Sequence, residues 1–339
     1  MSRLDVNELN RALDGFAGRR VTVLGDLIAD QFYWGDISRI SREAPVLVLE
    51  HRRTICAPGG AGNSVANLRT LGARPYPIGI VGRDSGGRRL IDRLREIGVS
   101  TSGILRVAEY ETPTKTRVLA GGRHTRRQQI VRLDEGERRG DLPARLQQRL
   151  RMVLRKALRQ SAGLLVADYG YGAASPAVLS SVLPLVKSLG LTVTADSRER
   201  VAEFRGITAC TPNQEEVQNA LNLESIDGAQ TLVEAGRALL RKTGDDAVLI
   251  TRGPEGMSLF RRGKQPLHIK AFGSDEVADV TGAGDTVIAA FTLALIAGGT
   301  PETAARLANY AAGKVVTKAG TATVSQEELR EAVHEDGSR

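Results

Sequence analysis

Residues 61–98 read AGNSVANLRTLGARPYPIGIVGRDSGGRRLIDRLREIG and alternate between two apolar patterns. Apolar residues recur at helical spacing over 61–71, form a continuous strand-like run over 76–81, and return to helical spacing over 84–96. A glycine stands at the end of each of these segments, as is common at turns. The stretch therefore predicts a helix, a strand and a second helix in succession.

The same alternation extends in both directions from this stretch. Before it, residues 21–26 (VTVLGD) form a short β-branched run that predicts a core strand. After residue 140, helices are predicted up to residue 160 and over 175–189, 212–221, 228–242, 284–297, 301–317 and 326–333, and strands over 164–167, 192–195, 247–251 and in a small hairpin over 257–269. Such alternation predicts an α/β fold with a mostly parallel sheet covered by helices on both faces, and a ligand at the carboxyl ends of the strands.

Four strand-like stretches are more polar than the others. They cover 31–37, 46–52, 114–120 and 128–133, and Gly121-Gly122 forms the turn between the last two. Because they have little apolar surface to bury, we expect them to pair with one another in a small β-sheet. This sheet, formed by about 31–53 and 113–134, is a candidate lid over the ligand. The whole chain, 1–339, is expected to form one domain.

The composition is that of a globular protein with a full core, since 41% of the 339 residues are hydrophobic and 25% are charged. The longest uncharged apolar stretch, 286–297, is shorter than the roughly 20 residues that cross a bilayer. The first sixteen residues lack the apolar core of a secretory signal. Cys56 and Cys210 have no metal or redox spacing, so we expect reduced thiols. These features favour a cytoplasmic protein that does not bind membranes.

The net charge of +8 leaves two interpretations open. Twelve arginines lie between Arg117 and Arg159, which is compatible with a nucleic-acid-binding surface. Opposed to this, aromatic residues are only 4% of the chain, no nucleic-acid-binding motif is recognisable, and the arginines from Arg138 onward fit the solvated face of a helix. We therefore expect no nucleic-acid partner and keep this function as an alternative.

The strongest chemical signal is Asp279-Val-Thr-Gly-Ala-Gly-Asp285-Thr, which stands between an extended segment and a helix. Amides of Gly282, Ala283 and Gly284 at the start of this helix would favour an anion such as a transferring phosphoryl group. Asp285 in the same turn could accept a proton from a substrate hydroxyl. The alternative is a glycine-rich turn with a capping carboxylate.

A second small-residue stretch, Gly59-Gly-Ala-Gly-Asn63, would let a polar ligand approach the backbone. It lacks the GxGxxG order of dinucleotide-binding loops, and the chain contains no Walker A loop. Amide and carboxylate side chains are suited to sugar hydroxyls. The predicted sugar-binding residues are Asp26, Asp30, Gly59, Gly60 and Asn63; turn and capping roles are the alternatives.

The nucleotide side is predicted from the stretch 211–216 (TPNQEE) and the turn 251–256 (TRGPEG). Asn213 and Glu216 share a helix face, where Glu216 could hold a hydrated Mg²⁺; the alternative is helix capping. A glycine-rich turn after a strand can pass under a nucleotide, or be an ordinary β-turn. The predicted nucleotide-binding residues are Asp196, Asn213, Glu216, Thr251, Gly253, Gly256 and Asn309.

The motifs 59–63 (GGAGN), 82–86 (GRDSG), 211–216 (TPNQEE) and 279–286 (DVTGAGDT), in this order and at these separations, resemble the ribokinase-like (PfkB) carbohydrate kinases. The resemblance covers the whole chain. It implies a Rossmann-type core with a β-sheet lid, ATP and Mg²⁺ as cosubstrates, and Asp285 as the base. It also implies that Asp279 and Thr281 help to hold a monovalent cation such as K⁺.

Further motifs resemble the heptose 7-phosphate kinases of this family. They are 35–41 (GDISRIS), 43–46 (EAPV), 115–117 (KTR), 127–129 (RQQ), 132–134 (RLD), 307–313 (LANYAAG) and 320–324 (GTATV). This resemblance implies phosphorylation of the C1 hydroxyl of D-glycero-β-D-manno-heptose 7-phosphate to the 1,7-bisphosphate, for ADP-heptose and lipopolysaccharide core synthesis. It also implies a homodimer that is joined through the lid. Some relatives carry a nucleotidylyltransferase domain with an HxGH motif; the sequence has none, so we expect a kinase without adenylyl transfer.

Two features of the lid and core qualify this resemblance. Tyr171 stands where these relatives usually have Lys, so nucleotide handling could differ. A substrate that carries a phosphate needs cations in reach, and we expect Lys115 and Arg117 to supply them. A kinase for ribose, fructose or a related sugar, and an inactive relative that only senses sugar or nucleotide, are the alternatives.

Overall fold

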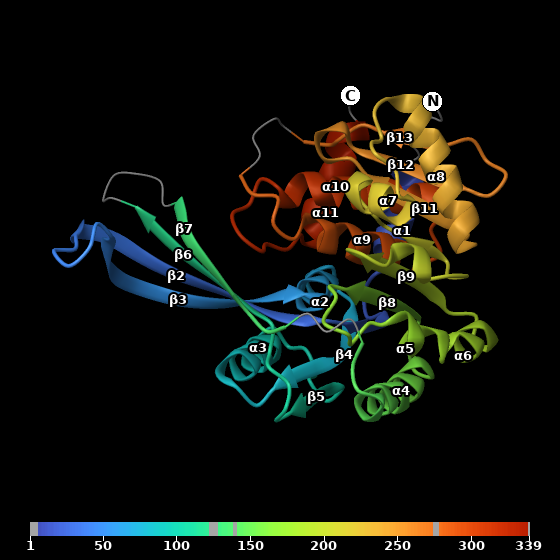
Figure 1. The fold of residues 1–339 in the computed structure, drawn as a ribbon. Coiled ribbons are helices and arrows are strands. Elements are labelled where there is room, and N and C mark those ends of the chain that lie inside the picture. Colours follow the sequence, from blue (N-terminus) through green and yellow to red (C-terminus); the bar gives the residue numbers. More distant parts are fainter. Residues whose placement is uncertain (1–5, 122–127, 138–140, 274–277, 338–339) are drawn as a thin grey trace.

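The computed structural model describes residues 6–121, 128–137, 141–273 and 278–337, and a nine-stranded sheet forms its centre (Figure 1). The strand order is β13-β12-β11-β10-β9-β8-β1-β4-β5, and all pairs are parallel except that β12 is antiparallel to both β11 and β13. The strands are β1 (Arg20–Gly25), β4 (Arg74–Gly82), β5 (Ile104–Val107), β8 (Gly163–Asp168), β9 (Thr192–Ser197), β10 (Ala209–Cys210), β11 (Ala247–Thr251), β12 (Met257–Arg261) and β13 (Leu267–Ile269). β1 and β8 are apolar and buried along almost their whole length, as strands covered on both faces require.

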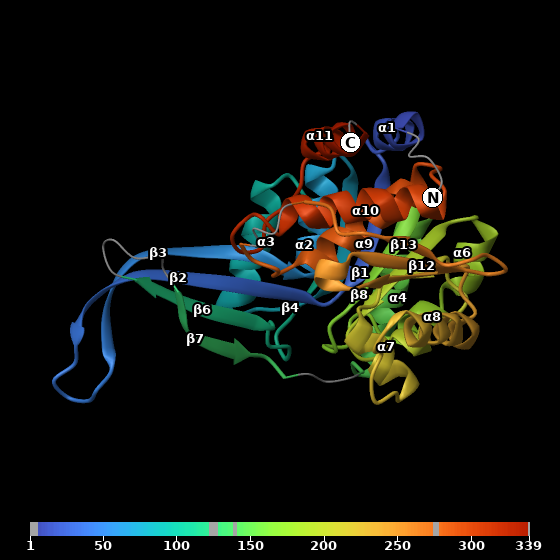
Figure 2. The same cartoon turned by 90° about the horizontal axis from the view of Figure 1, so that it is seen from above.

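Helices cover the two faces of this sheet (Figure 2). One layer contains α1 (Val6–Asp14), α2 (Ala61–Thr70), α3 (Ser85–Glu96), α9 (Ala283–Ile296), α10 (Pro301–Val315) and α11 (Gln326–Gly337). The other contains α4 (Ala144–Leu158), α5 (Pro176–Ser180), α6 (Leu183–Ser188), α7 (Gln214–Leu221) and α8 (Ala229–Thr243). Short 3₁₀ helices cover Val201–Glu203 and Gly253–Glu255. None of the described helices combines the length and apolar character that crossing a membrane needs.

A four-stranded sheet projects from the body of the protein (Figure 1). Its order is β3 (Leu47–Gly60), β2 (Leu27–Ile40), β6 (Thr114–Gly121) and β7 (Gln128–Glu135), with β2 and β6 parallel and the outer pairs antiparallel. The inner end of β2 is buried, whereas β7 is exposed throughout. The outer part carries the exposed apolar side chains of Ile37, Ile40 and Leu47, and those of Ile55, Ile130, Val131 and Leu133 are exposed nearer to the body.

The structure confirms the predicted fold class, a mostly parallel sheet between helices with a second, smaller sheet. Three elements were not predicted: α1, β5 and β10. β10 has only two residues, too few to show a period. The helix predicted over 175–189 is two short helices, with Pro184 in the first turn of the second. The predicted turn Gly121-Gly122 extends beyond the described residues.

Candidate active site

A cavity of about 230 Å³ lies where the carboxyl ends of β8 and β9 meet the start of α9 and the inner end of the four-stranded sheet. This volume is below the range of ordinary ligand pockets, roughly 300 to 1,000 Å³. A small ligand such as a sugar fits a cavity of this size. The lining residues are Ile28, Asp30, Gly60, Lys115, Arg117, Tyr169, Asp196, Arg198, Asn213, Glu216, Val280, Thr281, Gly282, Gly284, Asp285 and Thr321. The structure therefore brings ten of the predicted site residues together from six regions of the chain.

Asp285 lies in the first turn of α9 and is only 4% exposed. Its Oδ1 accepts hydrogen bonds from the hydroxyls of Tyr169 at 2.7 Å and Ser64 at 3.0 Å. Its Oδ2 accepts one from the side-chain nitrogen of Asn63 at 3.0 Å. Burial raises the pKa of Asp285 to about 6, while these three hydrogen bonds and Arg198 act in the opposite direction. The carboxylate is thus oriented by the protein and ionised at neutral pH, as a general base must be.

The glycine-rich turn before Asp285 has three distinct positions. Gly282 has φ = +78°, and a Cβ there would lie 2.3 Å from Nδ2 of Asn63. A Cβ on Gly284 would meet no protein atom within 4 Å, so it would point into open space. The amide of Ala283, which was also predicted to bind the anion, donates to the carbonyl of Val280 at 3.2 Å in this structure. Within the described residues, the amides of Gly282 and Gly284 have no acceptor and remain available.

Asp26 and Gly59, both predicted to bind sugar, do not reach the cavity. Asp26 is 1% exposed, and its carboxylate accepts the amides of Tyr169 at 2.8 Å, Tyr171 at 3.0 Å and Ala173 at 2.8 Å. Its carboxylate therefore binds the backbone of the 169–173 loop and does not line the cavity. A Cβ on Gly59 would lie 2.4 Å from Oδ2 of Asp30, so this glycine makes room for a neighbouring carboxylate.

Asn63, also predicted to bind sugar, is not among the residues that line the cavity. Besides its bond to Asp285, its side-chain nitrogen donates to the carbonyl of Gly282 at 3.3 Å. Its side-chain oxygen in turn accepts a hydrogen bond from Asn67 at 3.2 Å. Asn63 therefore links α2 to the start of α9, and its hydrogen bonds stabilise the turn that carries Asp285.

Asp30, Lys115 and Arg117 form the wall supplied by the four-stranded sheet. Nη1 of Arg117 lies 2.7 Å from Oδ1 of Asp30, and both side chains are largely buried. Lys115 pairs with Asp30 in the register of β2 and β6 and is 7% exposed. Burial, and then the charge of Arg198, lowers the pKa of Lys115. Among the described residues the Lys115 ammonium has no ion-pair partner, so it is a cation directed at the cavity.

Asp196 and Glu216 form an acidic side of the cavity. Asn213 and Glu216 make a capping box at the start of α7, with both hydrogen bonds at 2.8 Å, so the capping alternative is correct for their local structure. Burial raises the pKa of Glu216 to about 7, and burial and the charge of Glu216 raise that of Asp196. In the part of the chain that the structure describes, no three Asp, Glu, His or Cys side chains form a metal-binding group. One or two carboxylates fit Mg²⁺, which keeps several waters and takes further oxygens from phosphates.

Thr251, Gly253, Gly256 and Asn309 lie outside this cavity. Thr251 ends β11 and forms a parallel bridge to Asn213, so the 251–256 turn adjoins the acidic side. Gly256 has φ = +86°, and a Cβ there would lie 2.1 Å from the carbonyl oxygen of Ile269. Asn309 donates to the carbonyl of Lys270 at 2.8 Å. These residues shape a surface beside the cavity.

Tyr169 and Arg198 line the cavity but were not predicted. The guanidinium of Arg198 lies over the Tyr169 ring, 4.7 Å from its centroid. Each follows a buried strand, Tyr169 directly after β8 and Arg198 directly after β9. Polar residues that follow strand ends were therefore the signal that could have identified both.

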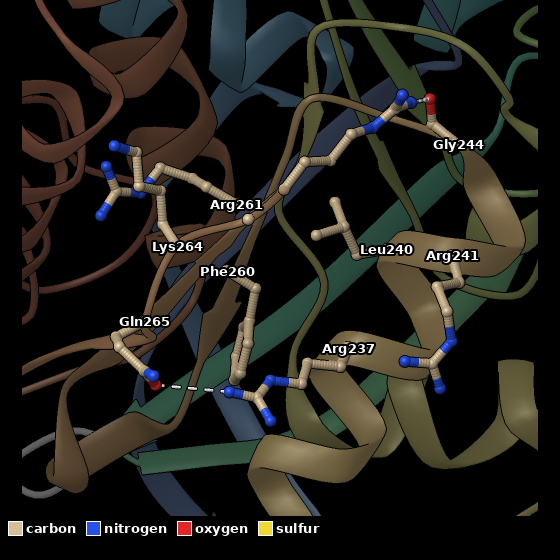
Figure 3. Close-up of a pocket in the computed structure, with 10 residues that line it drawn as sticks. Arg237, Leu240, Arg241, Gly244, Phe260, Arg261, Lys264 and Gln265 are labelled. Carbon is tan, nitrogen blue, oxygen red and sulfur yellow. Dashed lines mark hydrogen bonds between the residues drawn. The ribbon is translucent and has the colours of Figure 1, made fainter.

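A larger hollow, of about 680 Å³, lies between α8 and the connection from β12 to β13 (Figure 3). It is at the amino end of β11, whereas the cavity around Asp285 adjoins the carboxyl ends of the parallel strands. Arg262 donates to the carbonyl of Asp245, Arg237 donates to Gln265, and Arg261 pairs with Glu302. Most of its positive charge is thus engaged within the protein, and no predicted site residue lies there.

Known proteins resemble this chain over most of its length. A family model described as pfkB family carbohydrate kinase matches residues 19–328. The bifunctional protein HldE of Gluconobacter oxydans (strain 621H) is 40% identical over 319 residues, which are 94% of this chain and 65% of that protein. HldE of Desulfatibacillum aliphaticivorans is 38% identical over 316 residues, 93% of this chain and 63% of that protein. The chain thus spans less than two thirds of the length of these curated relatives.

Solved structures show the same fold. A ribokinase of Arabidopsis thaliana, solved with ribose and ATP, matches with a TM-score of 0.69 at 20% identity, over 94% of this chain and 99% of that one. Phosphofructokinase-2 of Escherichia coli in its tetrameric inhibited form matches with a TM-score of 0.73 at 16% identity, over 95% and 100%. At these identities the likeness establishes the arrangement of the chain and leaves the substrate open.

Proposed function

Because this chain belongs to the pfkB family of carbohydrate kinases, we propose that its cavity transfers the γ-phosphoryl group of ATP to a sugar phosphate. The substrate we propose is D-glycero-β-D-manno-heptose 7-phosphate, phosphorylated on its C1 hydroxyl to the 1,7-bisphosphate. The observation that carries the proposal is the buried carboxylate of Asp285, which lies in one turn with the amides of Gly282 and Gly284. It shares its cavity with Lys115, whose ammonium has no ion-pair partner among the described residues.

Asp285 acts as the general base. As the hydroxyl oxygen forms its bond to the γ-phosphorus, the bond from this phosphorus to the leaving oxygen of ADP breaks, and the hydroxyl proton passes to Asp285. The amides of Gly282 and Gly284, at the N-terminus of α9, stabilise the charge on the phosphoryl oxygens. Base and anion site thus lie in the first turn of one helix.

The nucleotide is proposed to lie across the acidic side of the cavity and the adjoining 251–256 turn. When bound, Mg²⁺ supplies charge neutralisation to the phosphate oxygens. Glu216 holds this ion, directly or through water, with Asp196 and Asn213 beside it. Asp279, which accepts the amides of Thr281 and Gly320, is the carboxylate proposed for a monovalent cation.

The 7-phosphate of the sugar is assigned to Lys115 and Arg117. Lys115 offers an ammonium with no partner among the described side chains, and Arg117 already holds Asp30 in place. An unphosphorylated sugar would leave the largely buried ammonium of Lys115 without a direct ion pair among the described residues, which is unfavourable in a low-dielectric wall. A sugar phosphate therefore fits this cavity better than ribose or fructose.

We further propose that the four-stranded sheet acts as a lid and joins two copies of the chain. Its outer part carries the exposed side chains of Ile37, Ile40 and Leu47, and it extends away from the body where a second copy can reach it (Figure 1). Exposed apolar patches of this kind are typical of protein interfaces. Because its inner end supplies Lys115 and Arg117, its placement also affects the substrate.

The test is ATP-dependent ADP release by the purified protein with Mg²⁺. Heptose 7-phosphate is compared with ribose, fructose, fructose 6-phosphate and sedoheptulose 7-phosphate. Selective turnover of heptose 7-phosphate is the expected result. Preferred turnover of another sugar would reject the heptose assignment, and absence of turnover with every sugar would reject the kinase proposal.

A further inference from the structure

Tyr169 lies at the junction of the cavity and the buried core. Its hydroxyl donates to Oδ1 of Asp285 at 2.7 Å, the shortest of the three hydrogen bonds to this carboxylate. The side chain is buried, and burial followed by the charge of Asp285 raises the pKa of Tyr169 well above its usual range. The phenol therefore stays protonated and donates a hydrogen bond to the carboxylate of Asp285.

The backbone of Tyr169 is held in place by the buried carboxylate of Asp26. Asp26 accepts its amide at 2.8 Å and those of Tyr171 and Ala173 farther along the same loop. Burial, and then the charge of Asp168, raises the pKa of Asp26 to about 6, against the effect of the three amides. A buried carboxylate directed entirely at one loop is a costly arrangement, and it fixes the backbone that carries Tyr169.

The ring of Tyr169 is held from the cavity side. The guanidinium of Arg198 lies over it at 4.7 Å from the centroid. Tyr169 is thus held at three points: Asp26 binds its backbone, Arg198 covers one face of its ring, and Asp285 accepts its hydroxyl. These contacts fix the orientation of the phenol. The hydrogen bond to Asp285 is thus formed before any ligand binds.

The two oxygens of Asp285 are consequently unequal. Oδ1 accepts two hydroxyl donors, from Tyr169 and Ser64, which use both of its lone-pair directions. Oδ2 accepts a single donor, Asn63, and keeps one lone pair free. A proton that arrives from a substrate hydroxyl can therefore be accepted only at Oδ2.

We propose that Tyr169 is a positioning residue that orients Asp285 so that Oδ2 receives the substrate proton, and that keeps the base ionised at neutral pH. This rests on the proposed kinase function, in which Asp285 is the base. The other charges that face Asp285 are Asp196 in β9 and Arg198 directly after it, with Asp30, Lys115, Arg117 and Glu216 around the same cavity. The remaining donors, Asn63 and Ser64 of α2, are neutral.

The direction of the pH effect follows from this arrangement. Asp285 must be ionised to accept a proton, so kcat/KM falls as pH drops through its pKa, near 6. A hydrogen bond from Tyr169 stabilises the ionised form and holds this pKa down. Its removal should move the acid limb of the profile upward by about one pH unit, the usual scale for a hydrogen bond to a charged group.

The experiment compares Tyr169→Phe with Tyr171→Phe in the full chain. Both variants remove one phenolic hydroxyl from the same buried loop, but only that of Tyr169 contacts Asp285. In Tyr169→Phe we expect the acid limb of kcat/KM to shift upward and kcat at pH 8 to fall, with an unchanged KM for ATP. In Tyr171→Phe we expect the acid limb to stay at its wild-type pH, whatever the value of kcat. An unshifted limb in Tyr169→Phe, or equal shifts in both variants, would overturn the proposal.

A second readout does not depend on turnover. The pKa of Asp285 is measured by NMR of ¹³C-labelled Asp carboxyls, with Asp285→Asn to assign the resonance. We expect a higher pKa in Tyr169→Phe than in the wild type and in Tyr171→Phe; equal values would overturn the positioning role. If the pKa shifts as expected but no sugar is turned over, the proposed function fails while the contact between Tyr169 and Asp285 stands.

Discussion

The side-chain nitrogen of Asn63 donates a hydrogen bond to Oδ2 of Asp285 at 3.0 Å, across 222 positions of sequence. This bond joins the first turn of α2 to the first turn of α9, and both turns face the carboxyl ends of the central strands. The GGAGN and DVTGAGDT stretches are therefore two halves of one structure. Its central element is the carboxylate of Asp285.

Asp285→Asn should abolish most of the phosphoryl transfer and leave the fold intact. The variant cannot accept the hydroxyl proton, and loss of a general base usually costs about 10²- to 10⁴-fold in rate. ADP release at saturating sugar and ATP measures the effect, with circular dichroism as the check on folding. Asp92→Asn, an exposed site on α3, is the control and should retain full activity. Turnover near the wild-type value in Asp285→Asn would contradict the assignment of the base.

Gly284→Ala should lower activity, whereas Gly282→Ala should lower stability. A methyl group on Gly284 meets no protein atom, so the protein should stay as stable as the wild type, while kcat falls because the methyl group occupies the space of the phosphoryl group. A methyl group on Gly282 meets Nδ2 of Asn63 at a positive φ, which should lower the melting temperature. Thermal unfolding and turnover of both variants are measured together. A fully active Gly284→Ala would show that no ligand approaches this position.

Lys115→Met should weaken binding of phosphorylated sugars selectively. Met keeps the buried apolar stem and removes the charge, and a hydrogen bond to a charged group contributes about 1.5–3 kcal/mol, or roughly 10- to 100-fold in KM. The KM for ATP should change little. Lys187→Met, at an exposed site on α6, is the matched control. Equal increases in KM for phosphorylated and unphosphorylated sugars would place the phosphate elsewhere.

Ile40→Asp should dissociate the proposed dimer. Ile40 is exposed at the end of β2, in the outer part of the four-stranded sheet, and a carboxylate there would be costly to bury between two copies. Sedimentation velocity should give a dimer for the wild type and a monomer for the variant. Met152→Asp, at an equally exposed apolar position on α4, should remain a dimer. A monomeric wild type would exclude the dimer directly.

The helices, strands and helix caps of this protein can be predicted from contiguous stretches of its sequence. The helix, strand and helix of 61–98 were predicted almost to their ends, because apolar period and terminal glycines depend only on neighbours along the chain. The capping box of Asn213 and Glu216 and the helix that begins after Gly282 are local in the same sense. The type and the ends of these elements can thus be predicted without knowledge of distant residues.

Tertiary structure alone determined which side chains meet. Asp26 and Asp30 lie four positions apart, yet Asp30 lines the cavity while Asp26 is buried under the 169–173 loop. Tyr169 contacts Asp285 because β8 lies between β1 and β9 in the central sheet, which brings its carboxyl end to the first turn of α9. Strand order depends on long-range pairing and on the packing of distant helices, and no local period encodes it. The type and ends of the elements therefore follow from neighbouring residues, whereas the direction of each carboxylate follows from the order in which the strands pair.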